Sequence, residues 1–399
     1  MKKRHTSKST VHTRKISTRE ELNFRIRRIN EAIANKDLEQ LRRLSQSENG
    51  FVNDGLRRRA WPLLLHCSRV ADDWDEKKAE EHKDERQVLM DVERSLNNYP
   101  TNLTSISKKQ KQDDLNDIIV EILRKNPLLH YYQGYHDICA SFLIVMATIE
   151  LLNNNKETEK ILSVYIYALT ITMLEDPTVF EFLDTLGVLP YYCLSWILTW
   201  CSHDITEFSK VARLFDFFLS SNPLMPVYFA AATVLSRREP LLALEPDNAV
   251  VHHFLSKFPQ DADIDAIISK AIELERNYSP EELQRKAGKG LDETSTVNTY
   301  STLWLRLHPG DPLPKLEVER ILGLLPTERK PIKFRARKKS RTVKEQQVAN
   351  RTAWTLFAVG AGMGTAVLFM LNNQAVRWVK TEMVVGWAMR DNGWRLSAR

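Results

Sequence analysis

Two short stretches carry polar side chains of a kind that can act on a reacting phosphate. In the first, Asp91 and Arg94 are three residues apart in a helical pattern, so the carboxylate and the guanidinium share a face and can pair. In the second, Gln133 precedes Gly134, where the missing Cβ lets the chain turn before an apolar run from Ile138 to Leu152. An arginine can neutralise charge that spreads over phosphate oxygens, and an amide can hold an attacking water.

Both stretches also have ordinary interpretations. A charged pair with this spacing is common on exposed helices, where it contributes little to stability. A glutamine close to a helix start can simply cap that helix. Taken one at a time, the two stretches therefore do not distinguish a functional site from an ordinary surface.

Taken together and in this order, the two stretches resemble two motifs of one family. Val88-x-x-Asp91-x-x-Arg94 is similar to the I-x-x-D-x-x-R motif of TBC-domain GTPase-activating proteins, with Val in place of the usual Ile. Tyr131-x-Gln133 is similar to their Y-x-Q motif. The segment 55–62 resembles the opening G-[LI]-R-x-x-x-W-P block of the family, and 189–196 and 213–218 resemble its later helices. The resemblance covers roughly residues 50–240.

The resemblance implies a function and a role for each of these residues. Arg94 would enter the active site of a GTP-bound Rab GTPase as an arginine finger. Gln133 would act as a glutamine finger in place of the glutamine of the GTPase. The supporting positions would be Asp91, Tyr131, Gly134 and Asp137. The chain would need no cofactor of its own, since GTP and Mg²⁺ belong to the partner, and it would carry out no reaction by itself.

The composition is that of a globular, helix-rich protein, with 43% apolar residues in 399. The net charge of +6 would suit a nucleic-acid partner, yet the surplus lies in three segments: residues 1–20 carry +6, residues 328–351 carry +8 and residues 372–399 carry +3. This leaves about −11 on residues 21–327. A basic groove on the folded body, and with it nucleic-acid binding, is therefore not expected.

The cysteines and histidines give no strong sign of a metal site. The four cysteines, at positions 67, 139, 193 and 201, are scattered without CxxC spacing and predict reduced core residues of a cytosolic domain. His136 and Cys139 are one helical turn apart and could form half of a metal site. No second half with ligand spacing follows, so no metal is expected.

The pattern of apolar residues predicts helix after helix, with short polar, Gly- or Pro-bearing separators and no alternating run typical of strands. The expected fold class is therefore all-α. The family resemblance implies that these helices form a multi-helix TBC domain. We expect a disordered basic tail over 1–16, N-terminal helices over 17–48, the TBC core over 49–240 and further helices of the same domain over 241–308. The first expected helix ends near residue 34. The further expected helices span 37–45, 54–67, 75–98, 111–125, 135–153, 157–174, 178–186, 190–201, 206–220, 225–236, 247–258, 263–277 and 280–286.

The C-terminal part predicts a membrane anchor. Residues 309–351 read as a linker that ends in a polybasic run, and residues 352–371 contain no charge and are long enough to cross about 30 Å of hydrocarbon as a transmembrane helix. Ten Lys and Arg residues before this span against five after it place the domain in the cytosol and residues 372–399 in the lumen. An anchored TBC domain resembles an ER-anchored member of the family. That implies the ER membrane, with the Golgi as second candidate, and an early-secretory Rab of the type 1 class in ER-to-Golgi traffic.

Two other classes of function stay open. A membrane-anchored scaffold could bind a small GTPase or a coat component without hydrolysis, although such a binder needs neither Arg94 nor Gln133. A membrane enzyme could use His130, His136 or Asp137 as acid and base groups.

Overall fold

The computed structural model describes residues 19–67, 80–100, 104–125, 127, 130–146, 165–288, 290–291, 295–308 and 311. All of them belong to a first compact unit, Met1–Leu325, and a second unit comprises Pro326–Arg399. Four predicted segments lie outside the described residues: the tail 1–16, the linker 309–351 apart from residue 311, the transmembrane helix 352–371 and the lumenal tail 372–399. None of the described helices is long and apolar enough to cross a membrane.

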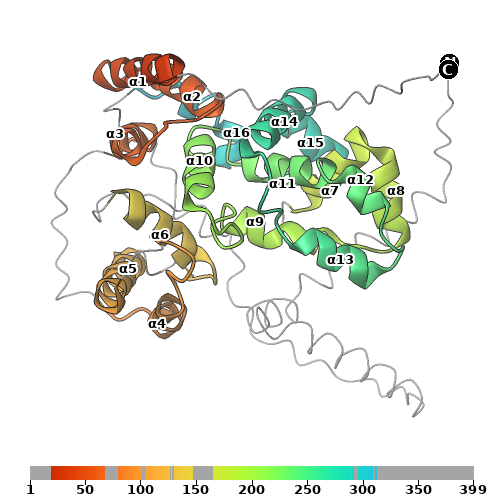
Figure 1. Cartoon of the computed structure of the whole chain (residues 1–399), viewed down its shortest axis with the longest axis horizontal. Coiled ribbons are helices and arrows are strands. Elements are labelled where there is room, and N and C mark those ends of the chain that lie inside the picture. Colours follow the sequence, from red (N-terminus) through yellow and green to blue (C-terminus); the bar gives the residue numbers. More distant parts are fainter. Residues whose placement is uncertain are drawn as a thin grey trace, which may run out of the picture. The chain divides into compact units, whose positions relative to one another are not determined.

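Every regular element in the described part of the chain is helical, so the predicted all-α class is confirmed there (Figure 1). The first half contains α1 (Arg19–Ala34), α2 (Leu38–Gln46), α3 (Asp54–Leu64), α4 (Glu85–Glu93), α5 (Ser105–Lys125), α6 (Tyr135–Met146), α7 (Tyr165–Glu175) and α8 (Pro177–Thr185). The second half contains η4 (Pro190–Cys193), α9 (Leu194–Leu198), α10 (Phe208–Phe218), α11 (Met225–Leu235), α12 (Arg238–Leu242), α13 (Asn248–Ser256), α14 (Ile264–Asn277), α15 (Pro280–Lys286), α16 (Thr296–Thr299) and η5 (Trp304–Arg306).

The predicted helix over 75–98 is wrong at both described ends. The chain is not helical from Glu80 to Asp84, and α4 begins only at Glu85. At the other end Arg94 is the C-cap, and Leu96 has a φ of +57°, a left-handed conformation that an α-helix cannot continue through. Charged, helix-forming residues before Glu85 made the segment look longer than it is at its N-terminal end.

Other boundaries differ more mildly. Helix α5 begins at Ser105, six residues before the predicted start at 111. The predicted helix over 190–201 is split into η4 and α9, and the positive φ values of Trp200 and Cys201 stop it early. Three short elements, α12, α16 and η5, were not predicted.

Helix α11 lies at the centre of the fold, where it packs against α7, α9 and α14 (Figure 1). Ten successive residues, Met225–Val234, are buried. A helix that is apolar all round is buried on all sides, which agrees with its prediction as a core helix rather than a membrane span.

Aromatic side chains join α3, α6 and α10. The Trp61 ring lies 5.5 Å from Phe142 in an edge-on arrangement and 6.0 Å from Phe215 in a stacked one. Trp200 completes the group at 5.2 Å from Phe215. Such pairs stabilise a core beyond their buried area, so the prediction that the aromatic stretch packs the core is confirmed.

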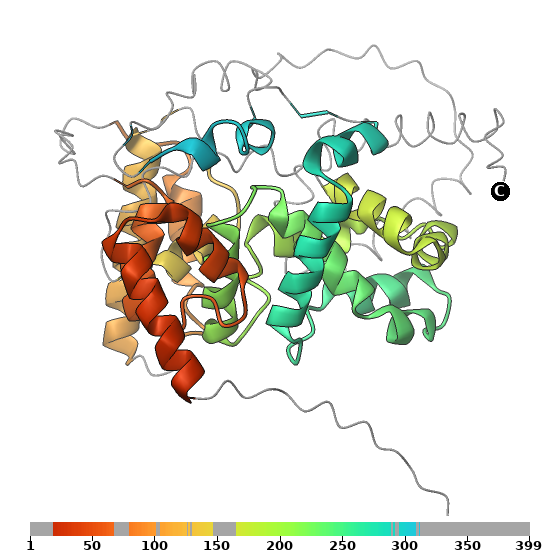
Figure 2. The ribbon, with the colours of Figure 1, turned by 90° about the horizontal axis from the view of Figure 1, so that it is seen from above.

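The N-terminal helices pack onto the same unit rather than standing apart. Figure 2 shows α1 lying along α2 and α3, with which it makes contact. Arg213 of α10 donates from Nη1 to the carbonyl of Ser45 at 2.8 Å and from Nη2 to that of Ser47 at 2.9 Å. Since the last carbonyls of a helix lack partners within it, this arginine fastens the end of α2 to α10.

A fully buried carboxylate ties three segments together. Asp216 of α10 is 0% exposed and accepts hydrogen bonds from the Arg57 Nε, the Trp61 Nε1 at 2.8 Å and the backbone N–H of Phe51 at 3.0 Å. Arg57 and Trp61 belong to the block over 55–62 that begins the family pattern. The block therefore has a structural task in the core of the described unit.

Candidate functional site

Arg94 closes α4 and reaches into solvent. Its side chain is 69% exposed, whereas that of Asp91 is 1% exposed. Nη2 of Arg94 donates to Oδ1 of Asp91 at 2.5 Å, and Nε donates to the carbonyl of Met90 at 3.1 Å. Nη1 makes no hydrogen bond to the part of the chain that the structure describes. The guanidinium is thus held along one edge by a buried carboxylate and left open along the other.

The two candidate motifs meet at Asp91. Its second oxygen, Oδ2, accepts a hydrogen bond from the Tyr131 hydroxyl at 3.0 Å, while the Tyr131 N–H donates to Asp84 at 3.0 Å. Burial, reinforced by the charge of Asp91, raises the pKa of Tyr131 well above its usual value, so the hydroxyl keeps its proton and donates. The structure therefore joins Arg94 to the segment that carries Gln133 through two hydrogen bonds.

Gln133 lies in the turn before α6. The N–H of Tyr135 donates to the carbonyl of Tyr132 at 3.2 Å, and that of Asp137 donates to Gly134 at 3.1 Å, so the turn is closed by backbone bonds. The Gln133 side chain is half-buried, and its carboxamide makes no hydrogen bond to the described residues. Its interpretation as a helix cap therefore finds no support in the described structure.

Gly134 is required by both its backbone and its surroundings. Its φ is +104°, which side chains with a Cβ rarely adopt, and an added Cβ would lie 2.7 Å from Cγ2 of Thr199. The turn that presents Gln133 therefore lies against the segment after α9. Gly187 offers a contrast, because its φ is +64° and no atom lies within 4 Å of an added Cβ.

We expect Gly134→Ala to destabilise the fold by about 2–4 kcal/mol, against about 1 kcal/mol for Gly187→Ala, because only the first adds a clash to the backbone strain. The measurement is the free energy of unfolding from urea titration followed by circular dichroism. Thr199→Ser removes the clashing methyl group and keeps the hydroxyl, so it should recover part of the loss in the double variant. Equal losses for Gly134→Ala and Gly187→Ala would show that the contact with Thr199 does not matter.

Asp137, at the start of α6, contacts two histidines. Its Oδ2 lies 2.9 Å from Nδ1 of His203, and its Oδ1 lies 3.5 Å from Nε2 of His136. The hydrogen bond to Asp137 raises the pKa of His203. His136 in turn contacts Tyr131, so Asp137 belongs to the same polar cluster as Asp91.

The sequence and the fold are similar to those of known proteins. The Rab-GTPase-TBC domain model matches residues 54–242. The chain is 37% identical to TBC1 domain family member 20 of Bos taurus over 313 residues, which cover 73% of this chain and 77% of that relative. The chain belongs to the Rab-GTPase-TBC domain family. The human TBC1 domain family member 20 is 38% identical over 271 residues, covering 63% of this chain and 66% of the relative.

More distant relatives agree with this family. GTPase-activating protein gyp10 of Schizosaccharomyces pombe is 30% identical over 259 residues, covering 59% of this chain and 68% of the relative. The crystal structure of the Ypt/Rab-GAP domain of Gyp1p superposes with a TM-score of 0.51 at 15% identity, over 65% of this chain and 99% of that one. The likeness to the Gyp1p domain concerns the fold alone.

The matched TBC region runs from the first residue of α3 to the last residue of α12. Helices α1 and α2 precede it, and α13 to α16 follow it, all of them within the first compact unit. Family membership makes the chain a Rab GTPase-activating protein and implies a Rab GTPase as its partner. Arg94 and Gln133 both lie inside the matched region.

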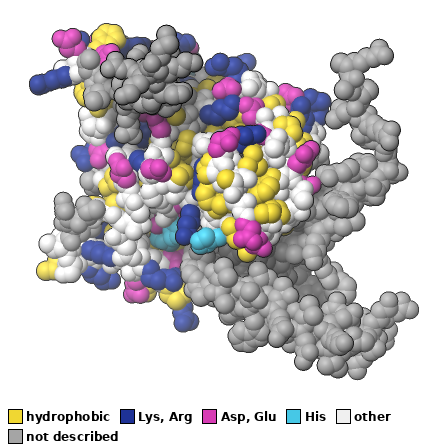
Figure 3. Space-filling view, turned by 45° about the vertical axis from the view of Figure 1, so that its right-hand side comes forward, with side chains coloured by type: hydrophobic (Ala, Val, Ile, Leu, Met, Phe, Trp, Pro, Cys, Tyr) yellow, Lys and Arg dark blue, Asp and Glu magenta, His cyan; other side chains and the backbone are white. Residues whose placement is uncertain are grey.

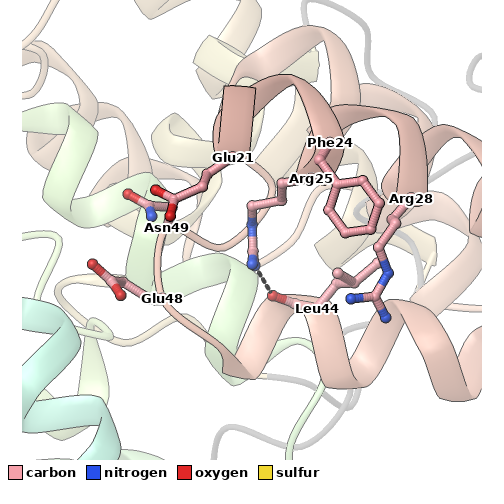
Figure 4. A pocket seen from close by; sticks show the side chains of 7 residues that line it. All are labelled: Glu21, Phe24, Arg25, Arg28, Leu44, Glu48 and Asn49. Carbon is pink, nitrogen blue, oxygen red and sulfur yellow. Dashed lines mark hydrogen bonds between the residues drawn. The ribbon is translucent and has the colours of Figure 1, made fainter. Parts of the chain in front are cut away.

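A surface hollow of about 330 Å³ lies outside the matched TBC region, between α1 and the end of α2 (Figure 4). It is lined by Glu21, Phe24, Arg25, Arg28, Leu44, Glu48 and Asn49. The charges of its two arginines and two glutamates balance, and Arg25 donates to the carbonyls of Leu44 and Gly50. The hollow is thus part of the joint between the N-terminal helices and holds none of the predicted site residues.

The acid–base candidates of the alternative enzyme are only partly brought together. His136 and Asp137 are in contact, but His130 lies beside Lys83 and Asp84, at 3.4 Å and 3.8 Å. Within the described residues no group of three or more His, Cys, Asp or Glu side chains could hold a metal ion. The four cysteines are free thiols, and three of them are buried.

Positively and negatively charged side chains are mixed on the face drawn in Figure 3. Figure 3 shows Lys and Arg side chains interspersed with Asp and Glu over the described part of that face, without a continuous basic stripe. This agrees with the negative balance of residues 21–327.

Sequence reasoning missed two residues that position the site. Thr199 lies against Gly134, and His203 pairs with Asp137, although both are more than 60 residues away along the chain. No local pattern marks either of them. The signal would have been the fold itself, which places the end of α9 behind the turn at Gly134.

Proposed function

We propose that the chain supplies Arg94 and Gln133 in trans to a GTP-bound Rab GTPase and so accelerates the hydrolysis of its GTP. The observation that carries this proposal is the shared carboxylate of Asp91, which accepts from Arg94 and from Tyr131 at once. It couples the two motifs and leaves one edge of an exposed guanidinium open. A protein that only binds a GTPase has no need of this arrangement.

The chemistry follows from the charge that develops on the γ-phosphate. In the transition state negative charge spreads over the phosphate oxygens, and an arginine entering from outside can lower the barrier by an amount worth about 10³–10⁵ in rate. The amide of Gln133 would orient the attacking water in place of the glutamine of the GTPase. GTP and Mg²⁺ would come with the partner, so the chain would carry no cofactor and no complete active site of its own.

Exposed apolar residues beside Arg94 support a protein partner on this face. Leu89 is 45% exposed and Met90 is 42% exposed, and both lie on α4 within the last two turns before Arg94. Apolar side chains next to a functional arginine suit the centre of a protein interface. The GTPase would then cover them as Arg94 enters its active site.

Leu89→Asp is expected to raise the KM for the GTPase by about tenfold or more while kcat changes much less, because a charge is buried in the interface without a partner. The matched control is Val250→Asp on α13, where an apolar residue is 39% exposed outside the matched TBC region. Steady-state kinetics against the loaded GTPase separate the two parameters. Equal effects of the two variants would place the interface elsewhere.

We also propose a membrane anchor and a site of action. The uncharged residues 352–371 and the polybasic run over 328–351 support a single-pass anchor with a cytosolic domain. Anchoring would raise the effective concentration of the chain at the membrane that carries the lipid-modified GTPase. The ER membrane, an early-secretory Rab of the type 1 class and a role in ER-to-Golgi traffic complete the proposal. The alternative is a silent anchored scaffold.

The test is a single-turnover assay of GTP hydrolysis across a panel of purified Rab GTPases. The proposed function predicts strong stimulation of early-secretory members at catalytic amounts of the chain. Binding without stimulation of any member would favour the scaffold. Equal stimulation of unrelated members would contradict the assigned class but not the activity.

A further inference from the structure

A line of polar side chains continues beyond Asp91 into the protein. The Tyr131 hydroxyl, which donates to Asp91, also lies 2.9 Å from Nδ1 of His136. Nε2 of the same ring lies 3.5 Å from Oδ1 of Asp137. His136 is only 8% exposed, so protein groups rather than bulk water determine where its protons lie.

Tyr131 has one hydroxyl proton and two neighbours that can accept it. If the proton points to Asp91, the contact with His136 is a hydrogen bond only when Nδ1 carries a proton and donates to the hydroxyl oxygen. If Nδ1 carries no proton, Tyr131 donates to His136 instead. Its oxygen lone pairs then face the Asp91 carboxylate at 3.0 Å. The protons of His136 therefore decide whether Tyr131 supports Asp91.

Asp137 lies on the other side of the ring without fixing its proton. Its Oδ1 is 3.5 Å from Nε2, an ionic contact rather than a hydrogen bond, and its Oδ2 lies 2.9 Å from Nδ1 of His203. The contact of Nδ1 with Tyr131 is shorter, at 2.9 Å, so it favours an N–H on Nδ1. With that N–H in place, Tyr131 can accept from His136 and donate to Asp91 at the same time.

We propose that His136 is a positioning residue for Arg94, which acts by donating from Nδ1 to Tyr131 and so directing the Tyr131 proton onto Asp91. The Asp91 carboxylate is then fixed on one oxygen by Tyr131 while the other oxygen holds the guanidinium. This matters because the Arg94 side chain is 69% exposed and has few other contacts that restrict it. The inference rests on the proposed role of Arg94.

Several titratable groups face this line from the elements packed around it. They are Asp91 of α4, Arg94 at the C-cap of α4, Tyr99 before α5, Tyr131 before α6, Asp137 and Cys139 of α6, and His203 and Asp204 after α9. Burial raises the pKa values of the two tyrosines and of Cys139, so these groups stay protonated at neutral pH. Burial also raises the pKa of Asp204 to about 6, and Asp137 raises that of His203. Since Asp204 and His203 can change charge close to neutral pH, the test compares variants of His136 at one fixed pH.

The experiment measures stimulated GTP hydrolysis by the full-length chain at one fixed pH, divided by the rate of the GTPase alone. His136→Asn places an amide N–H near the position of Nδ1, so the donor to Tyr131 is kept. This variant should keep kcat within about twofold of the wild type.

His136→Leu has no donor, so its kcat should be about 2- to 10-fold lower, with KM unchanged. The inference is overturned if His136→Leu matches the wild type, or if His136→Asn loses as much of kcat as His136→Leu. Circular dichroism confirms that each variant is folded.

A double variant separates this inference from the proposed function. If His136 acts through Arg94, then His136→Leu should cause no further loss once Arg94→Ala is present. Additive losses would overturn the inference and leave the role of Arg94 intact. Full stimulation by Arg94→Ala alone would instead overturn the proposed function, and the inference with it.

Discussion

Replacing Arg94 with alanine is expected to lower the stimulated rate of GTP hydrolysis by about 10²-fold or more while the fold stays intact. The rate should fall because the guanidinium would no longer neutralise the charge on the transferring phosphate. The fold should persist because the side chain is 69% exposed and its ion pair with Asp91 spans a single helix turn. Gln133→Ala should cause a loss of similar size, because the attacking water would no longer be oriented. The fold should again persist, since the Gln133 carboxamide makes no hydrogen bond to the described residues.

Two comparisons make this prediction specific. Arg86→Ala removes an exposed arginine from the same helix and should leave the rate within about twofold of the wild type. Arg94→Lys keeps the positive charge but not the planar fork, so most of the stimulation should be lost. Wild-type stimulation by both Arg94→Ala and Gln133→Ala would show that neither residue is a finger.

Replacing Asp216 with alanine is expected to cost about 3–5 kcal/mol in the free energy of unfolding. The side chain is 0% exposed and binds Arg57, Trp61 and the backbone of Phe51. Its removal leaves the Arg57 guanidinium, whose side chain is 8% exposed, with the 2.8 Å contact to Asp54 as its remaining ion pair to the described residues. An inadequately paired buried charge costs far more than the loss of a surface pair.

Asp113→Ala is the matched control, because it also removes an aspartate from an ion pair, here with Lys109. The Asp113 side chain is 52% exposed. That change should alter the free energy of unfolding by no more than about 0.5 kcal/mol. Urea denaturation monitored by circular dichroism gives both values. Equal stability of the two variants would mean that Asp216 does not hold α3 and α10 together.

Much of the fold follows from the sequence because several helices begin where capping residues and prolines favour a helix start. Pro177 and Pro280 each stand at a helix start, with a capping Asp176 and Ser279 in front. The apolar run of α11 predicts burial on all sides, and the residues from Met225 to Val234 are all buried. The spacing of Asp91 and Arg94 likewise predicts their pairing, which the structure contains.

What the sequence cannot supply are contacts between distant segments. The bond between Asp91 and Tyr131 joins positions 40 residues apart, and that between Asp137 and His203 joins positions 66 apart. The end of α4 also eluded prediction, since the left-handed backbone at Leu96 follows from tertiary packing and not from a Gly or Pro at that position. The family motifs, rather than a local pattern, predict that Arg94 and Gln133 act together.

The most direct measurement uses a Rab GTPase whose own catalytic glutamine has been replaced by alanine. If Gln133 takes the place of that glutamine and Arg94 neutralises the phosphate charge, the wild-type chain will still stimulate this GTPase, to within about tenfold of the unaltered one. The chains with Gln133→Ala or Arg94→Ala will stimulate it about 10²-fold less or not at all. Absence of any stimulation by the wild-type chain, or equal stimulation by all three chains, would contradict the account.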